Sequence, residues 1–193
     1  MELQKQGDEN VILETERLLL RPWTMEDLED FNQYCQDAQV GPNAGWKPHE
    51  SLEESRGILE GWMKGAEGEI NWAIVPKETG RASGSISLMK DGRRPGVPKC
   101  LELGYAMSRE EWGKGYMTEA AKAVIAYGFG NLGLAMISIN HYAYNHRSRR
   151  VIEKCGFTYE GTLRQGAFLY DGRIEDLCCY SMTAAEYQEK YKK

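Results

Sequence analysis

The chain lacks an apolar run of the roughly 20 residues that a helix needs to cross a bilayer. Its first residues also lack the apolar core of a secretory signal peptide. With 24 Lys and Arg against 29 Asp and Glu, it lacks the excess of positive charge on which general nucleic-acid binding depends. We therefore expect a cytoplasmic protein with no membrane and no nucleic-acid partner.

A disulfide framework and a metal site are not indicated either. The five cysteines are odd in number and form no C-x-x-C pair, and the three histidines do not complete a ligand set with them. The cysteines are therefore expected to be reduced thiols, as is usual in the cytosol.

The composition that remains is that of an ordinary globular protein. Hydrophobic residues make up 41% and charged residues 27% of a 193-residue chain. This length suits one domain, and no repeat, low-complexity tract or linker interrupts the sequence. We therefore predict a single domain over residues 1–193.

Hydrophobic patterns predict strands and helices in a mixed α/β order. Strands are predicted at 11–21, 70–75, 82–89, 100–107 and 134–139, with two more joined at Asp171-Gly172. Helices are predicted at about 24–35, from Ser51, at 116–129, around 151–155 and from Thr183, and 40–49 is predicted to be a loop. The unit over 100–140 is strand, helix, strand, so its two strands are expected to be parallel. The turn after residue 107 then lies at the carboxyl end of a strand, where open α/β sheets bind ligands.

That turn contains Gly113-Lys114-Gly115 and leads into a predicted helix. The first turn of a helix has unpaired N–H donors, and its dipole favours anions. Gly113 and Gly115 lack a Cβ atom, so a ligand can approach their backbone closely. Residues 113–118 are therefore predicted to bind a phosphate or pyrophosphate.

The glycine turn has three alternative interpretations. A Walker A loop fails because no glycine stands five residues before Gly113 and neither Ser nor Thr follows Lys114. A Rossmann fingerprint needs a third glycine at the helix start, which is missing. A helix beginning at Ser108 with both glycines inside it stays open, at a cost of about 2 kcal/mol relative to alanine.

Two segments in this order, ELGYAMSREEWGKGYMTEA (102–120) and NHRSRRVIEKCGFTYEGTLR (145–164), resemble the GNAT acetyltransferases. The resemblance is closest to their ribosomal-protein-alanine N-acetyltransferase-like (RimJ/RimL-type) branch, and it extends to Gly45-Trp46. It implies a mixed, mostly antiparallel sheet whose parallel fourth and fifth strands splay apart to admit the pantetheine of acetyl-CoA. One departure is Glu110, where the family has Gln or Arg. Because backbone N–H groups hold the phosphates, this departure is tolerable.

The resemblance also implies which residues hold acetyl-CoA. They are Met107, Gly113, Lys114, Gly115, Tyr116, Met117, Thr118, Asn145 and Ser148. Backbone N–H groups at a strand bulge near Met107 are expected to polarise the thioester carbonyl. Lys114 is expected at the pyrophosphate, and Asn145 is expected to orient the pantetheine or the motif backbone. The basic residues at 146–150 form either a solvated helix face or further phosphate contacts.

Amine acetylation needs a base, because only a neutral amine attacks the thioester. Glu102 and Glu160 are the alternatives from the family pattern, and each can equally be an exposed strand glutamate. Water, or an amine that is already neutral, is a further alternative.

The acid that reprotonates the CoA thiolate is a helix tyrosine in many family members. Here the helix carries Val151 and Ile152 at those positions, which leaves Ser148, one turn before Ile152. Ser148 is either that acid or a small residue in a packed stripe. Aromatic residues either line the acceptor pocket or fill the core, namely Trp46, Trp72 and Tyr105.

The resemblance thus predicts direct acetyl transfer from acetyl-CoA to a primary amine. No cysteine stands in a recognisable nucleophile motif with a histidine, so no acyl-enzyme is expected. The branch favours the N-terminal α-amine of a protein or peptide as acceptor. The alternatives are a small amine such as a polyamine, amino acid or aminoglycoside, a CoA-binding module without catalysis, and a structural domain. The sequence is compatible with a monomer or a homodimer.

Overall fold

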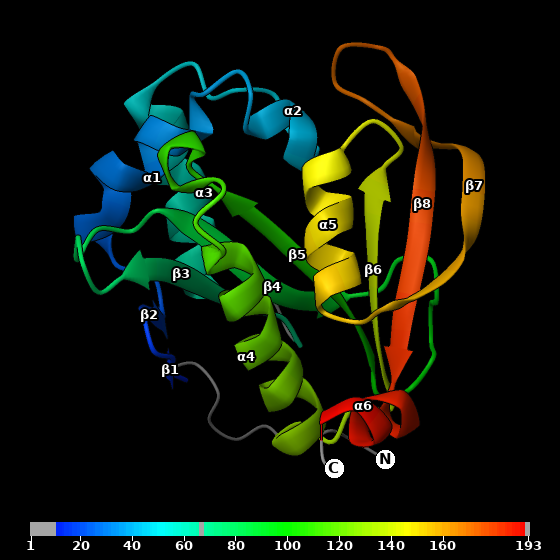
Figure 1. Ribbon diagram of the computed structural model, residues 1–193. Helices are drawn as coiled ribbons and strands as arrows, with labels where there is room; N and C mark the ends of the chain where they lie inside the picture. Colours follow the sequence, from blue (N-terminus) through cyan, green and yellow to red (C-terminus); the bar gives the residue numbers. More distant parts are fainter. Residues whose placement is uncertain (1–10, 66–67, 192–193) are drawn as a thin grey trace.

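The computed structural model describes residues 11–65 and 68–191. At its centre lies one eight-stranded sheet in the order β1-β2-β3-β4-β5-β6-β8-β7 (Figure 1). The strands are β1 (Leu13–Glu14), β2 (Leu18–Arg21), β3 (Ile70–Pro76), β4 (Gly84–Lys90), β5 (Cys100–Met107), β6 (Met136–Tyr142), β7 (Thr158–Phe168) and β8 (Ile174–Thr183). All neighbours are antiparallel except β5 and β6, which are parallel. The predicted mixed, mostly antiparallel sheet is confirmed.

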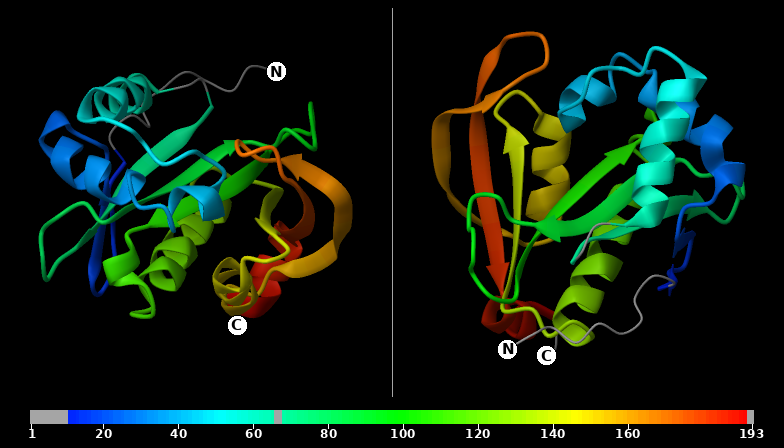
Figure 2. Two further views of the ribbon diagram at one scale, coloured as in Figure 1. Left: turned by 90° about the horizontal axis from the view of Figure 1, so that it is seen from above. Right: turned by 180° about the vertical axis from the view of Figure 1, so that it is seen from behind.

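Helices cover both faces of this sheet (Figure 2). On one side lie α1 (Leu28–Cys35), α2 (Gly41–Ala44) and α3 (Leu52–Lys64), and on the other α4 (Tyr116–Gly130) and α5 (His146–Lys154), with α6 (Ala184–Tyr191) beside the end of β8. Strand residues alternate between the two faces. Among the residues described, the core accordingly consists of two hydrophobic clusters, one on each face of the sheet. Leu88 and Leu103 belong to the cluster that packs against α4, whereas Ala73 and Ala106 belong to the cluster that packs against α1 and α3.

The parallel strands separate after a short contact. β5 and β6 pair only from Cys100 opposite Met136 to Glu102 opposite Ser138, and then diverge (Figure 1). The backbone O of Lys99 accepts hydrogen bonds from the start of β6, while Ser108 N donates to Ser83 on the β4 side. Because N–H directions alternate along a strand, the odd-numbered residues of β5 point their N–H groups towards the β6 side. Beyond residue 102, these groups face the gap.

The splayed parallel pair is thus confirmed, but the expected bulge near Met107 is wrong. β4 and β5 keep one register from Lys90 opposite Leu101 to Gly84 opposite Met107. The N–H groups are exposed because β6 turns away, and no extra residue in β5 is needed.

Three predicted elements differ in the structure. The strand expected at 11–21 is a hairpin of β1 and β2, because Thr15 turns the chain: its N–H donates to Leu18 O and its hydroxyl accepts from Leu18 N, both at 2.9 Å. The loop expected at 40–49 contains the short helix α2, whose first turn holds Pro42, which suits that position. The strand β6 begins two residues later than predicted and runs to Tyr142.

Local signals elsewhere are confirmed. Ser51 caps α3 by accepting from Glu54 N at 3.1 Å, and Gly172 turns the β7–β8 hairpin with φ of 85°. The interpretation with both glycines inside one helix is excluded. Residues 109–111 form one turn of 3₁₀ helix, and α4 begins only after Gly115, which has φ of 84°. No helix in the described part of the chain is long and apolar enough to span a bilayer.

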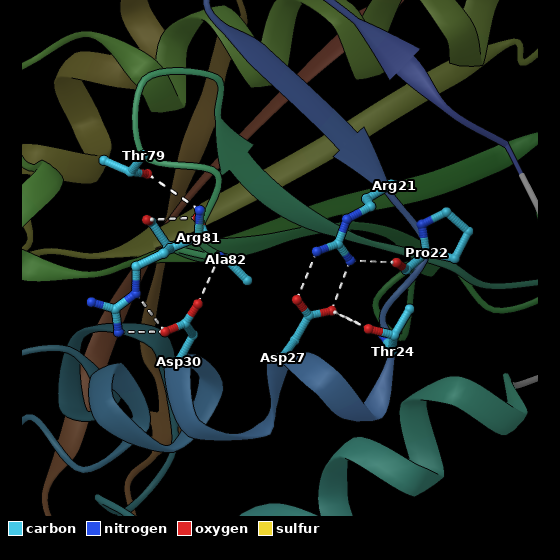
Figure 3. A network of polar contacts seen from close by, with 9 residues as sticks. Arg21, Pro22, Thr24, Asp27, Asp30, Thr79, Arg81 and Ala82 are labelled. Atoms are coloured by element: carbon cyan, nitrogen blue, oxygen red, sulfur yellow. Dashed lines mark hydrogen bonds and ion pairs between the residues drawn. The ribbon is translucent and has the colours of Figure 1, made fainter.

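An ion pair anchors the start of α1 to the sheet (Figure 3). Arg21 on β2 donates two hydrogen bonds to the Asp27 carboxylate, each 2.7 Å long, and Thr24 N donates a third of 2.9 Å. Burial alone would raise the pKa of Asp27, but Arg21 and Thr24 outweigh it and the pKa is lowered. The neighbouring pair of Asp30 with Arg81 is more exposed.

Replacing Asp27 by Asn is expected to lower the free energy of unfolding by about 2 kcal/mol, since a mostly buried arginine loses its charge partner. The lowered pKa means that this contribution is complete above the ordinary aspartate pKa and is lost as the pH falls below about 4. Urea denaturation at pH 7 and pH 3 measures both effects. Asp30→Asn is the control and should cost less than about 1 kcal/mol. Equal losses for the two variants would contradict the expectation.

Candidate active site

A cavity of about 440 Å³ opens where β5 and β6 have separated. Its walls are the end of β5, the first turn of α4 and one side of α5, and α2 closes it at one end. The cavity is therefore produced by the splay together with the two helices that flank it.

The floor at the α4 end presents free backbone donors. None of the N–H groups of residues 113–118 has a hydrogen-bond acceptor within residues 11–65 and 68–191. Gly113 and Gly115 have φ of 82° and 84°, a conformation that glycine adopts at little cost. A Cβ atom at Gly113 would meet no atom within 4 Å, so the approach to this backbone is open. The geometry suits an anion at the N-terminus of α4.

Cationic side chains of α5 face the same cavity. Arg147, Arg150 and Lys154 line it, and within the described residues none of them has an ion-pair partner. Arg147 stacks over the Trp112 ring, with 4.5 Å between the guanidinium carbon and the ring centre. By contrast, Arg149 is turned to Glu153 at 2.8 Å. The cavity side of α5 is therefore basic. Its three cationic residues are spaced three and four positions apart in the sequence, which places them on one face of a helix.

Most residues predicted to bind the cofactor line this cavity. They are Met107, Gly113, Gly115, Tyr116, Met117, Thr118, Asn145 and Ser148. Lys114 does not line it. Its ammonium donates to Glu111 Oε2 at 2.8 Å, which raises the pKa of Lys114.

Asn145 joins α5 to α2. Its Oδ1 accepts from Ser148 N at 3.1 Å and so caps α5, and its Nδ2 donates to Asn43 O at 3.1 Å. Tyr144 adds a hydrogen bond of 2.9 Å to Pro42 O. These contacts bring Val40, Asn43 and Ala44 to the cavity, residues that no local sequence pattern indicated.

The predicted acceptor residues are divided by the structure. Tyr105 lines the cavity, and its hydroxyl lies 2.9 Å from Ser148 Oγ. Trp72 is 1% exposed, packs against Tyr127 and donates to Val11 O, so it is a core residue and does not line the cavity. Trp46 does not line it either and packs against the cluster under α1 and α3.

The two predicted bases lie outside the cavity in a network of paired charges. Glu102 is ion-paired to Arg93 at 2.5 Å and accepts a hydrogen bond from Asn140 Nδ2. Glu160 on β7 is ion-paired to Arg94 and accepts from Ser181 Oγ at 2.8 Å.

A third carboxylate, Asp91, completes this network. Asp91 accepts from Ser138 Oγ at 2.7 Å and from Arg94 at 2.8 Å. Burial alone would raise the pKa of Asp91, but these hydrogen bonds outweigh it and the pKa is lowered. Each carboxylate of the network therefore has an arginine partner.

Known proteins with similar sequences and structures identify the family to which the chain belongs. The family model described as acetyltransferase (GNAT) domain matches residues 17–158. The chain belongs to the GNAT acetyltransferases. An uncharacterized N-acetyltransferase of Bacillus subtilis, YoaA, is 32% identical over 89% of this chain and 96% of its own. A solved GNAT-family acetyltransferase of Bacillus anthracis is 25% identical with a TM-score of 0.79, covering 91% of this chain and 100% of its own.

The protein is therefore an acyltransferase enzyme, and the family uses acetyl-CoA. Two further structures share the fold at 21% identity, which bears on the fold alone. One is a ribosomal-protein-S5-alanine acetyltransferase of Vibrio fischeri, with a TM-score of 0.77 over 92% of this chain and 99% of its own. The other is a spermidine N-acetyltransferase of Vibrio cholerae in complex with CoA and spermine. It has a TM-score of 0.75, covering 90% of this chain and 99% of its own. The GNAT acetyltransferase fold is thus common to enzymes named for different amines.

Proposed function

We propose that this GNAT acetyltransferase transfers acetyl from acetyl-CoA directly to the N-terminal α-amine of a protein or peptide. The observation that best supports acetyl-CoA as cofactor is the row of free backbone N–H groups at 113–118. This row opens on a cavity whose wall contains Arg147, Arg150 and Lys154. Phosphates of CoA suit both features. When bound, acetyl-CoA supplies an activated acyl group.

The chain's own donors fit the rest of such a ligand. The N–H groups of Leu103, Tyr105 and Met107 face the gap between β5 and β6. Such a row can bind amide groups of pantetheine as a neighbouring strand would, and can polarise the thioester carbonyl. Met107 is the donor nearest the glycine turn, and Leu103 follows directly on Glu102.

For the base we propose Glu102. It stands at the last paired position of β5, where the gap begins, whereas Glu160 lies on β7, separated from β5 by β6 and β8. Glu102 would take a proton from the amine directly or through water. Glu160 then holds Arg94, and through it Asp91, in place.

The charge balance of the carboxylate–arginine network around Glu102 favours an acceptor with one positive charge. Asp91, Glu102 and Glu160 are each paired with Arg93 or Arg94. A polyamine with several charges gains most from carboxylates without such partners. An α-amine carries one charge and has a pKa near 8, so a sizeable fraction is neutral at physiological pH. These features support the protein N-terminal branch that the sequence resembles.

The test is a parallel assay of purified enzyme with acetyl-CoA and two acceptor panels. One panel holds peptides with free N-termini that begin with alanine or serine, and the other holds spermidine, spermine, free amino acids and an aminoglycoside. We expect N-terminally acetylated peptide by mass spectrometry, and none from the same peptides with blocked N-termini. Turnover confined to the small amines would reject the peptide acceptor while leaving the acetyltransferase reaction in place.

A further inference from the structure

The helix α5 does not offer a strong acid to the cavity. Val151 lines the cavity with an apolar side chain, and Ile152 is fully buried in the core. Ser148 is on the cavity side, but an aliphatic hydroxyl is a much weaker acid than a phenol. A phenol on another element would be a better proton donor to the leaving sulfur.

Tyr105 approaches from the opposite wall. It lies on β5, beyond the last residue paired with β6, and its side chain reaches across the gap to α5. Its hydroxyl oxygen is 2.9 Å from Ser148 Oγ and 3.3 Å from the backbone O of Ser148. The phenol therefore lines the cavity at the gap where the β5 donors are exposed.

The environment keeps this phenol protonated. Burial raises the pKa of Tyr105 above its ordinary value, and the hydrogen bond with Ser148 only partly opposes this. No carboxylate and no ammonium group within residues 11–65 and 68–191 bonds to the hydroxyl. A neutral phenol at physiological pH can donate a proton or a hydrogen bond to a developing thiolate.

We propose that Tyr105 is the general acid of this enzyme and that Ser148 is the residue that positions it. The proposal rests on the acetyl transfer proposed above. As the C–S bond breaks and its electron pair passes to sulfur, Tyr105 gives its hydroxyl proton to that sulfur, which leaves a free thiol. The phenolate regains a proton from solvent by way of the Ser148 hydroxyl. The amine nitrogen, whose lone pair makes the new C–N bond, loses its proton to Glu102 or to water.

The decisive variant is Tyr105→Phe, which removes the hydroxyl and keeps the ring. We expect kcat to fall about 100-fold, the lower range for loss of an acid catalyst, with the Kd of acetyl-CoA in calorimetry changed less than about threefold. Tyr34→Phe is the matched control, since Tyr34 is a buried tyrosine that does not line this cavity.

A second readout does not depend on turnover. The pKa of the CoA thiol is measured in the enzyme–CoA complex from the ultraviolet absorbance of its thiolate. A hydrogen bond from Tyr105 favours the thiolate, so Tyr105→Phe should raise this pKa by about 1, while Tyr34→Phe leaves it unchanged. A role of Tyr105 in merely bridging β5 and α5 would alter CoA affinity without moving the thiol pKa, and that result would overturn the proposal.

The role of Ser148 is separated by a double-mutant cycle. Ser148→Ala should lower kcat about tenfold, Ser148→Thr should restore it, and Ser148→Ala should add nothing once Tyr105 is Phe. A large loss from Ser148→Ala with an unaffected Tyr105→Phe would make Ser148 the donor and reject Tyr105. Failure of the wild-type enzyme to bind CoA would instead reject the proposed function itself.

Discussion

Replacing Gly115 by Trp is expected to abolish measurable binding of acetyl-CoA, with a loss of affinity of at least about 100-fold, or 2.7 kcal/mol. Gly115 precedes α4 with φ of 84°, where any residue with a Cβ atom is strained by about 1–2 kcal/mol. An indole ring would also stand over the N–H row that a phosphate must approach. A Cβ atom at position 115 would lie 3.5 Å from the Arg17 guanidinium, which donates to Lys114 O and helps to hold the turn.

The measurement is calorimetric titration of acetyl-CoA into wild type and variant. Gly80→Trp is the control, because Gly80 also has a positive φ of 67° and no atom within 4 Å of a built Cβ, but does not line the cavity. The control should bind acetyl-CoA as the wild type does and shows what backbone strain alone costs in stability. Unchanged affinity in Gly115→Trp would mean that the phosphates bind elsewhere.

The glycine turn was predictable because its signal is local. Two glycines before a helix specify a backbone conformation that neighbouring residues alone determine. The same holds for Ser51, which caps α3, and for Asp171-Gly172, which turns the last hairpin. In each case a few adjacent residues settle the hydrogen bonds, so the sequence carries the information directly.

Other parts of the site depend on contacts between distant segments, which no local pattern encodes. α2 reaches the cavity because Tyr144 and Asn145 bond to Pro42 and Asn43, about 100 positions away. Trp72 belongs to the core because Tyr127 of α4 packs against it. An aromatic residue in a strand looks the same in the sequence whether it meets a ligand or a helix, so only the fold separates the two roles.

The ion pairs around Glu102 also depend on contacts between distant segments, which no local sequence pattern predicts. The family pattern left Glu102 and Glu160 as alternatives for the base, and each could equally have been an exposed glutamate of a strand. Their difference comes from the strand order, which places Glu102 beside the gap and Glu160 on the outermost strand. The arginines that pair with them come from the β4–β5 connection, whose path the sequence did not predict.

Glu102→Gln is therefore expected to lower kcat/KM about 100-fold at pH 7, with little change in the Kd of acetyl-CoA. The amide keeps the size of the side chain and its contact with Asn140, but it cannot take a proton from the amine. Glu160→Gln is the matched control, since it removes a carboxylate of the same network from a strand that does not border the gap. Its effect on kcat/KM should stay below about fivefold.

The pH dependence distinguishes a base from a residue that only supports the fold. An α-amine with a pKa near 8 becomes neutral as the pH rises, so the need for a base decreases. The deficit of Glu102→Gln should therefore shrink towards about tenfold at pH 9, whereas damage to the arginine network would persist at every pH at which the protein stays folded. Thermal unfolding of both variants checks their stability. If Glu102→Gln loses nothing at pH 7, water or an already neutral amine performs the deprotonation and Glu102 serves only to hold Arg93.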